Sequence, residues 1–316
     1  MGLLCAAAFA ALLAGCREEG KALPSTRKVS LPAPAAAGAS LRLDALGREW
    51  IVAGGQAMVV DTGRAPRVSR IAAGAGSPLA APMWDLSGRL YADSSRSALA
   101  EIAARAGIAP PGIKLTGPVA RDPRGRWIYG TLRHAGIVGL RADSLRVLWG
   151  WPHAGPAATA LAASPLGDRV YLALDASETE GTEPRVQVRD QQTGRVLADA
   201  KQPMPARSLV AAGDGFLYGY AEADGTGAVF SLRHVPDGLE ERWRTSLRHA
   251  GMTAPAAVRL SPTGERLAVF GEGGVRLLDA RTGTVVGHLN ERPRDAAFDA
   301  RGQLHLLYAA RTEVIP

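Results

Sequence analysis

The sequence predicts an all-β fold, a seven-bladed β-propeller whose blades are four-stranded antiparallel sheets. Three observations predict it. A short turn motif ending in glycine recurs seven times, a strand-like alternation of apolar and polar residues follows each copy, and the copies are evenly spaced. A repeat of roughly 40–50 residues built from turns and short strands is typical of propeller blades. We expect a signal peptide and a tether before the propeller.

The turn motif has the residue types that a tight hairpin requires. Its copies end at Gly47, Gly88, Gly125, Gly167, Gly215, Gly264 and Gly302, which are 41, 37, 42, 48, 49 and 38 residues apart. All copies but the one ending at Gly215 begin with Asp or Ser, whose side chain can accept a hydrogen bond from the backbone two residues on. Glycine tolerates the positive φ that such turns need. We therefore expect each of these glycines to be left-handed and to lie between two antiparallel strands.

A second turn motif, Asp-x-x-Thr-Gly, occurs at residues 190–194 and 279–283, each time between two strand-like segments. With these two motifs, residues 40–316 resemble the WD40-like and YVTN-type β-propellers. The resemblance lies in the pattern, since the Gly-His and Trp-Asp pairs of WD40 repeats are absent. It implies a ring of blades around a central channel.

The last blade predicts how the ring closes. Residues 294–316 contain only three strand-like segments, and an open edge in a ring would leave backbone groups unpaired. Residues 25–32, with the sequence STRKVSLP, form the unused strand-like segment at the other end of the propeller. We expect them to supply the outer strand of the last blade.

The first residues are similar to the signal peptide of bacterial lipoproteins. A short apolar stretch ends in Leu-Ala-Gly-Cys at Cys16, as a lipobox does, although the preceding Met-Gly carries no Lys or Arg. The resemblance implies that residues 1–15 are removed and that Cys16 receives the lipid. Arg17 stands where an inner-membrane retention signal has Asp, which favours the periplasmic face of the outer membrane. Residues 16–39 are rich in Ala, Pro and Gly and are expected to form a tether, with the closing strand within it.

The composition excludes several function classes. The net charge of +7 is spread along the chain without a run of five basic residues, so we expect no nucleic-acid partner. No apolar run reaches the roughly 20 residues of a spanning helix. Cys5 and Cys16 are the only cysteines, so the propeller has no disulfide, Cys-based zinc site or c-type haem. The acidic residues 175–183 match no calcium loop, and we expect no metal and no cofactor.

Propellers usually bind at the face where the loops between the second and third strands meet the loops between blades. The repeat places six candidate residues there: Arg133, His134, Trp151, His153, His249 and Arg292. Trp and Arg are frequent anchors of protein interfaces. We expect these side chains to be dispersed around one rim, as in a binding face, and not to converge as catalytic groups do.

Two functions follow from these features. The first is a lipid-anchored, periplasm-facing propeller that acts as a non-catalytic protein-binding or scaffold module of the cell envelope, similar in location and architecture to the propeller lipoprotein subunit of the outer-membrane barrel-assembly machine. The alternative is a propeller enzyme, either a lactonase-like hydrolase or a degenerate quinoprotein, with a site over the central channel. His, Arg and carboxylates that converge on the channel would favour the enzyme.

Overall fold

The computed structural model describes residues 20–43, 48–53, 56–61, 67–72, 118–122, 125–132, 136–141, 147–152, 157–175, 183–247 and 253–316. Every regular element within these ranges is a β-strand, and the strands form six sheets. In the same ranges there is no helix of the length and hydropathy that a membrane span requires. The all-β class predicted from the sequence is confirmed.

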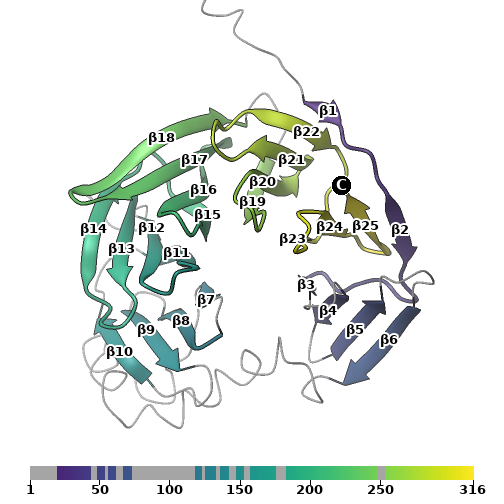
Figure 1. Ribbon diagram of the computed structural model, residues 1–316, viewed down its shortest axis with the longest axis horizontal. Coiled ribbons are helices and arrows are strands. Elements are labelled where there is room, and N and C mark those ends of the chain that lie inside the picture. Colours follow the sequence, from purple (N-terminus) through teal and green to yellow (C-terminus); the bar gives the residue numbers. More distant parts are fainter. Residues whose placement is uncertain are drawn as a thin grey trace, which may run out of the picture.

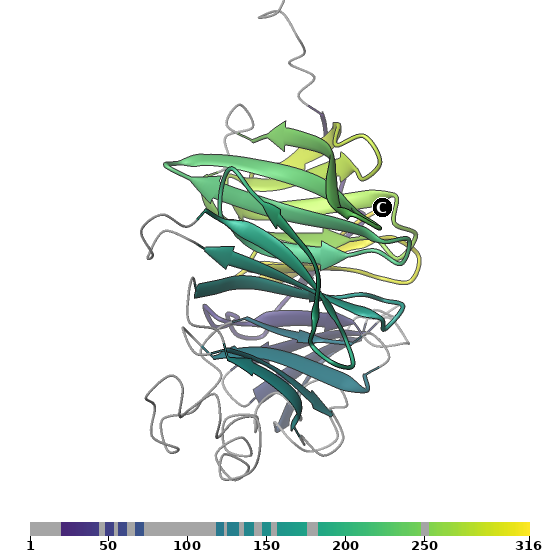
Figure 2. The same cartoon turned by 90° about the vertical axis from the view of Figure 1, so that its left-hand side faces the viewer.

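The six sheets follow one another around a central axis (Figure 1), and Figure 2 shows them from the side of the ring. The first contains β3 (Ser40–Leu43), β4 (Glu49–Ala53), β5 (Gln56–Asp61) and β6 (Arg67–Ala72). The next two contain β7 (Val119–Arg121), β8 (Trp127–Leu132), β9 (Gly136–Arg141) and β10 (Val147–Pro152), and then β11 (Ala157–Ala163), β12 (Arg169–Asp175), β13 (Arg185–Asp190) and β14 (Val196–Lys201). They are followed by β15 (Ala206–Ala211), β16 (Phe216–Ala223), β17 (Thr226–Val235) and β18 (Gly238–Ser246), and by β19 (Thr253–Leu260), β20 (Arg266–Glu272), β21 (Gly274–Asp279) and β22 (Val285–Leu289). The last contains β23 (Asp295–Phe298), β24 (Leu304–Leu307) and β25 (Arg311–Ile315).

This arrangement is a β-propeller. Within the strands named above, each sheet pairs its strands antiparallel in chain order, and its first named strand lies nearest the axis (Figure 1). We number the six sheets as blades one and three to seven, because the second repeat of the sequence, which ends at Gly88, falls within residues 73–117, outside the described residues.

The turn motif forms the hairpin between the first and second strands of a blade. Its five described glycines, Gly125, Gly167, Gly215, Gly264 and Gly302, have φ values of 69°, 75°, 86°, 76° and 79°. In blade four the Gly167 N–H donates to the carbonyl oxygen of Ser164 at 3.0 Å, which closes a four-residue turn. The left-handed glycine predicted from the sequence is confirmed at these five positions.

The apolar core lies between neighbouring blades. Tyr171 and Val188 of blade four pack with Leu217 and Phe230 of blade five in one buried cluster, and equivalent clusters join the other adjacent blades that the structure describes. Burying one such side chain contributes about 1.5–3 kcal/mol. Blades four to seven are therefore each stabilised on both faces by their neighbours.

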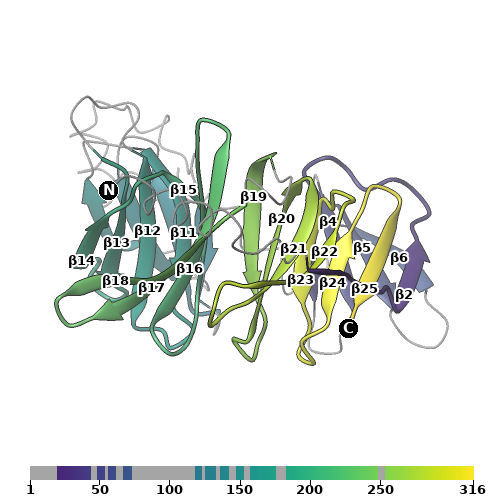
Figure 3. The ribbon, with the colours of Figure 1, turned by 90° about the horizontal axis from the view of Figure 1, so that it is seen from above.

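Two short strands precede blade one on the outside of the ring. β2 (Arg27–Ser30) pairs antiparallel with β25, with Arg27 opposite Val314 and Ser30 opposite Arg311, and so is the fourth strand of blade seven. Figure 3 shows β2 beside β25 at the outer edge. β1 (Lys21–Ala22) pairs parallel with β22 as a fifth strand of blade six. Residues 20–30, whose composition is that of a tether, thus lie along the outer edges of two blades.

A buried ionic cluster joins β2 and blade seven to blade one. The Glu49 carboxylate of β4 is fully buried and accepts from the Arg27 guanidinium at 2.8 Å. It also lies 2.8 Å from His305 Nδ1 of β24, whose Nε2 lies 3.4 Å from Asp299. Because a buried carboxylate is costly without partners, this cluster favours one position of β2.

Candidate functional site

Four of the six rim residues predicted from the sequence, namely Arg133, His134, His153 and His249, lie outside the described residues. The structure describes the other two, Trp151 and Arg292. Each of these contacts another blade or loop of the same chain.

Trp151 lies near the end of β10, in the outer strand of blade three. Its indole Nε1–H donates to the carbonyl oxygen of Thr193 in the Asp-x-x-Thr-Gly turn of blade four, at 2.9 Å. The ring also lies so close to Gly194 that a Cβ there would be 2.5 Å from Trp151 Nε1. The side chain remains 40% exposed. Trp151 therefore joins two blades and keeps part of its ring at the surface.

A second tryptophan of β10 makes a similar contact: Trp149, two residues before Trp151, donates its indole N–H to Gln191 O at 2.8 Å. The contact of Trp149 recurs between blades five and six, where Trp243 of β18 donates its indole N–H to Ala280 O at 3.0 Å. Both acceptors directly follow the aspartate of an Asp-x-x-Thr-Gly turn. The outer strand of one blade thus carries a tryptophan that packs on the turn of the next.

Arg292 lies at the predicted face, in the loop that follows β22. Its guanidinium forms an ion pair of 2.6 Å with Glu272 at the end of β20, and both side chains are exposed. An exposed pair of this kind contributes about 0–1 kcal/mol.

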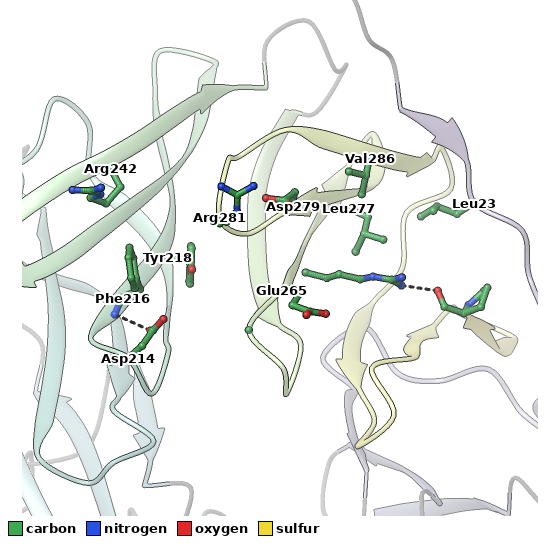
Figure 4. A pocket seen from close by; sticks show the side chains of 13 residues that line it. Leu23, Asp214, Phe216, Tyr218, Arg242, Glu265, Leu277, Asp279, Arg281 and Val286 are labelled. Atoms are coloured by element: carbon green, nitrogen blue, oxygen red, sulfur yellow. Dashed lines mark hydrogen bonds between the residues drawn. The ribbon is translucent and has the colours of Figure 1, made fainter.

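A groove lies at the opposite edge of the ring, where the first-to-second and third-to-fourth strand turns of a blade come together. It has a volume of about 960 Å³ and follows the turns of blade six between blades five and seven (Figure 4). A smaller groove of about 310 Å³ lies at the same edge between blades four and five, and Asp214 lines both. The turn edge of blades four to six therefore carries two neighbouring grooves.

The groove combines apolar, aromatic and charged groups. Its lining includes Arg242, Arg266 and Arg281, Asp214, Glu265 and Asp279, and Leu23, Phe216, Tyr218, Leu277 and Val286. Three arginines face three carboxylates, so the lining has little net charge. Burial, with the nearby carboxylates of Asp214 and Asp279, raises the pKa of the Tyr218 phenol to about 12. Arg281 is exposed at the mouth of the groove.

Several carboxylates at the groove are already engaged in local turns. Asp279 accepts from the backbone N–H and the hydroxyl of Thr282, at 2.8 and 2.9 Å. Asp214 accepts from the Phe216 N–H at 3.3 Å. The arginines are less constrained, since Arg266 donates to the Pro316 carbonyl oxygen at 3.0 Å and Arg242 to Glu240 at 3.1 Å, both at exposed positions. The groove therefore presents charged groups of both signs beside apolar walls.

The innermost strands carry polar groups that join blade to blade. The bonds run from Thr159 to Ala206 O (2.6 Å), from Val258 N–H to Ser208 Oγ (3.1 Å), from Arg259 to Asp295 (2.8 Å), and from Leu41 N–H to Asp295 (2.9 Å). They link blades four, five, six, seven and one in sequence. In these blades the polar groups nearest the axis are therefore used to hold the ring together.

The acidic segment at residues 175–183 is described only at its two ends. Asp175 pairs with Arg207 at 2.9 Å, and Glu183 pairs with Lys201 at 2.6 Å. Within the described ranges there is no group of three or more His, Cys, Asp or Glu side chains placed to hold a metal ion.

The sequence pointed to the loop edge of the ring, and the groove at the turn edge was missed. Two signals in the sequence could have found it. The Asp-x-x-Thr-Gly turn at residues 279–283 carries the exposed Arg281, and Phe216 and Tyr218 directly follow the turn at Gly215. Aromatic residues and an arginine beside the turns of neighbouring blades are typical of a binding surface, and they would have predicted one at the turn edge.

Similarity to known proteins is found among solved structures. No protein-family description matches the chain, and no curated protein matches its sequence. Among solved structures it is similar to the β-propeller domain of Cps50 (Swd1) from Myceliophteria thermophila, with 14% identity and a TM-score of 0.47. The match covers 60% of this chain and 60% of that one.

Proposed function

We propose that this chain is a lipid-anchored β-propeller that faces the periplasm and acts as a non-catalytic protein-binding or scaffold module of the cell envelope. The lipobox at Cys16 and the residue that follows it support the anchor and the outer membrane. The propeller fold supports a rigid platform on which loops and turns can hold a partner.

The groove at the turn edge carries the binding part of the proposal. It places arginines, aromatic rings and apolar side chains around an open volume of about 960 Å³. Arginine and aromatic side chains dominate the energetics of protein interfaces. The polar groups near the axis, in contrast, bond to neighbouring blades. A partner is therefore expected to bind at the outer turn edge, with the channel as a structural centre.

Site-specific photo-crosslinking in membranes tests this proposal. A photoreactive residue replaces Arg281 at the groove in one variant and Arg292 at the loop edge in a matched variant, since both are exposed arginines. We expect a discrete crosslinked protein from position 281 and at least about tenfold less from position 292. If neither position gives a crosslinked protein, the proposal that this chain is a protein-binding module is wrong. If only position 292 gives one, the partner binds at the loop edge and not at the groove.

The anchor is tested separately. Cys16→Ser removes the thiol that receives the lipid, so the protein should remain uncleaved or leave the detergent phase. Wild-type protein that partitions into the aqueous phase would contradict lipid anchoring.

A further inference from the structure

The outer edge of blade six is only partly covered by the chain's own N-terminal segment. β22 has five residues, and β1 pairs with two of them, with Lys21 opposite Gly287 and Ala22 opposite His288. The Leu23 N–H adds a bond to His288 O at 3.1 Å. Among the described residues, the rest of this edge of β22 has no strand beside it. An exposed strand edge is a template for pairing with another segment.

Two glycines allow the close approach of β1 to β22. A Cβ at Gly20 would lie 2.5 Å from the backbone nitrogen of Gly287, and a Cβ at Gly287 would collide with the Leu23 side chain. Gly20 also places its carbonyl oxygen against His288 Nδ1. A segment that adds here therefore needs glycine at the first position and fits leucine three residues later.

One side chain anchors β1. Leu23 is half-buried and packs on the apolar cluster between blades six and seven, whereas Lys21 and Ala22 are exposed. A two-residue strand with one apolar anchor is a weakly held occupant. Its release would not open the ring, because β2 pairs independently with β25 over four residues.

The surface beside Leu23 continues into the groove. The groove is lined by Leu23 together with Leu277 and Val286. Val286 lies on β22 itself and is 46% exposed. A longer extended segment could pair further along β22 and cover Val286, which β1 leaves open. The edge and the groove thus form one surface that fits an extended peptide strand.

We infer that the β22 edge is a strand-addition site for an extended segment of a partner protein with the pattern Gly-x-x-Leu, and that β1 is the chain's own occupant, which the partner segment replaces. The inference rests on the proposed binding function and names the kind of partner segment. Main-chain bonds to an edge strand supply the affinity in this mode, and alternate side chains supply the specificity. Because β1 competes, the apparent affinity for a partner equals the intrinsic affinity multiplied by the fraction of molecules in which the edge is free.

A peptide-binding measurement on the full chain tests the inference. The probe is a fluorescent peptide with the chain's own residues 18–25, EEGKALPS. Leu23→Asp removes the apolar anchor of β1 and should free the edge. We expect this variant to bind the probe at least about tenfold more tightly than the wild type does. Lys21→Asp, a charge change at an exposed position of the same strand, should bind as the wild type does.

The glycine requirement is tested on the peptide, so that no outcome depends on whether a variant folds. A probe with valine in place of the glycine should bind Leu23→Asp at least about tenfold more weakly, because a side chain at that position collides with β22. Equal binding of the two probes, or no binding to Leu23→Asp, would overturn the inference. A wild-type dimer in sedimentation that is lost when Gly20 is replaced by valine would also overturn the inference, because it would assign the site to a second copy of this chain. Crosslinking at position 281 would persist in these cases, so the proposed function is judged separately.

Discussion

Trp243 of blade five donates its indole N–H to the carbonyl oxygen of Ala280 in blade six, at 3.0 Å. The ring lies on Gly283, where a Cβ would be 2.5 Å from the indole Cε3, and Gly283 has a φ of 74°. Two residues on, the Thr245 hydroxyl donates to Gly283 O at 2.8 Å. The turn of one blade is therefore shaped to receive the outer strand of the preceding blade.

Trp243→Ala should destabilise the propeller by about 2 kcal/mol, since it removes a half-buried ring and one hydrogen bond to the next blade. Trp151→Ala should cost about 1 kcal/mol, because Trp151 is 40% exposed and Trp149 remains on the same turn. Urea unfolding of both variants measures the difference. Equal losses would show that the outer-strand tryptophans do not act through burial on the turn.

Arg27→Ala should destabilise the protein by about 2–3 kcal/mol, because it leaves the buried Glu49 carboxylate without its arginine while His305 remains. Lys28→Ala is the matched control on the same strand. Its 3.5 Å contact joins an exposed ammonium group to the buried Glu313 carboxylate, which Arg311 also contacts, and should contribute less than about 0.5 kcal/mol. Similar free energies of unfolding for the two variants would contradict a role for the buried cluster in fixing β2.

The hydrogen bonds of the Asp279 carboxylate should make the free energy of unfolding depend on pH. Hydrogen bonds from the Thr282 hydroxyl and backbone N–H hold the pKa of the Asp279 carboxyl below its usual range. A depressed pKa stabilises the folded state above the unfolded pKa of about 3.9, and the contribution is lost as the pH falls through the folded pKa. Asp279→Ala should therefore lower the melting temperature at pH 7, and the difference from wild type should narrow below about pH 4.

Two substitutions of Thr282 check the cause of that dependence. Thr282→Val removes the hydroxyl donor and should reproduce part of the loss at pH 7, whereas Thr282→Ser keeps it and should stay near the wild type. A constant gap between Asp279→Ala and wild type from pH 7 to pH 3 would show that the carboxylate bonds do not stabilise the turn.

Local chemistry explains which parts of the fold the sequence predicts. The left-handed conformation of Gly167 and Gly264 follows from a four-residue motif whose bonds are all local. The contacts between blades are different. Trp243 bonds a backbone carbonyl 37 residues away, and a carbonyl acceptor has no sequence signature. β1 was missed for a related reason, since two paired residues are too few to show an alternation of apolar and polar positions.

The position of β1 also changes what the tether can do. Lys21 lies only five positions after Cys16, which allows at most about 18 Å of extended chain. If Cys16 carries the lipid, the outer edge of blade six is held near the bilayer. The remaining blades then project from that edge.

Single-cysteine labelling measures this orientation, because the sequence after Cys16 contains no other cysteine. Val286→Cys places a fluorophore on β22, and Val196→Cys places one on β14, the outer strand of blade four, two blades away around the ring (Figure 1); both positions are exposed. With an acceptor dye on the lipid headgroups of vesicles, energy transfer should be much stronger from position 286 than from position 196. Adding Leu23→Asp should reduce that contrast, because it frees residues 20–26 and lengthens the attachment. Equal transfer from both positions in lipidated protein would contradict a fixed orientation, and Cys16→Ser should abolish transfer from both.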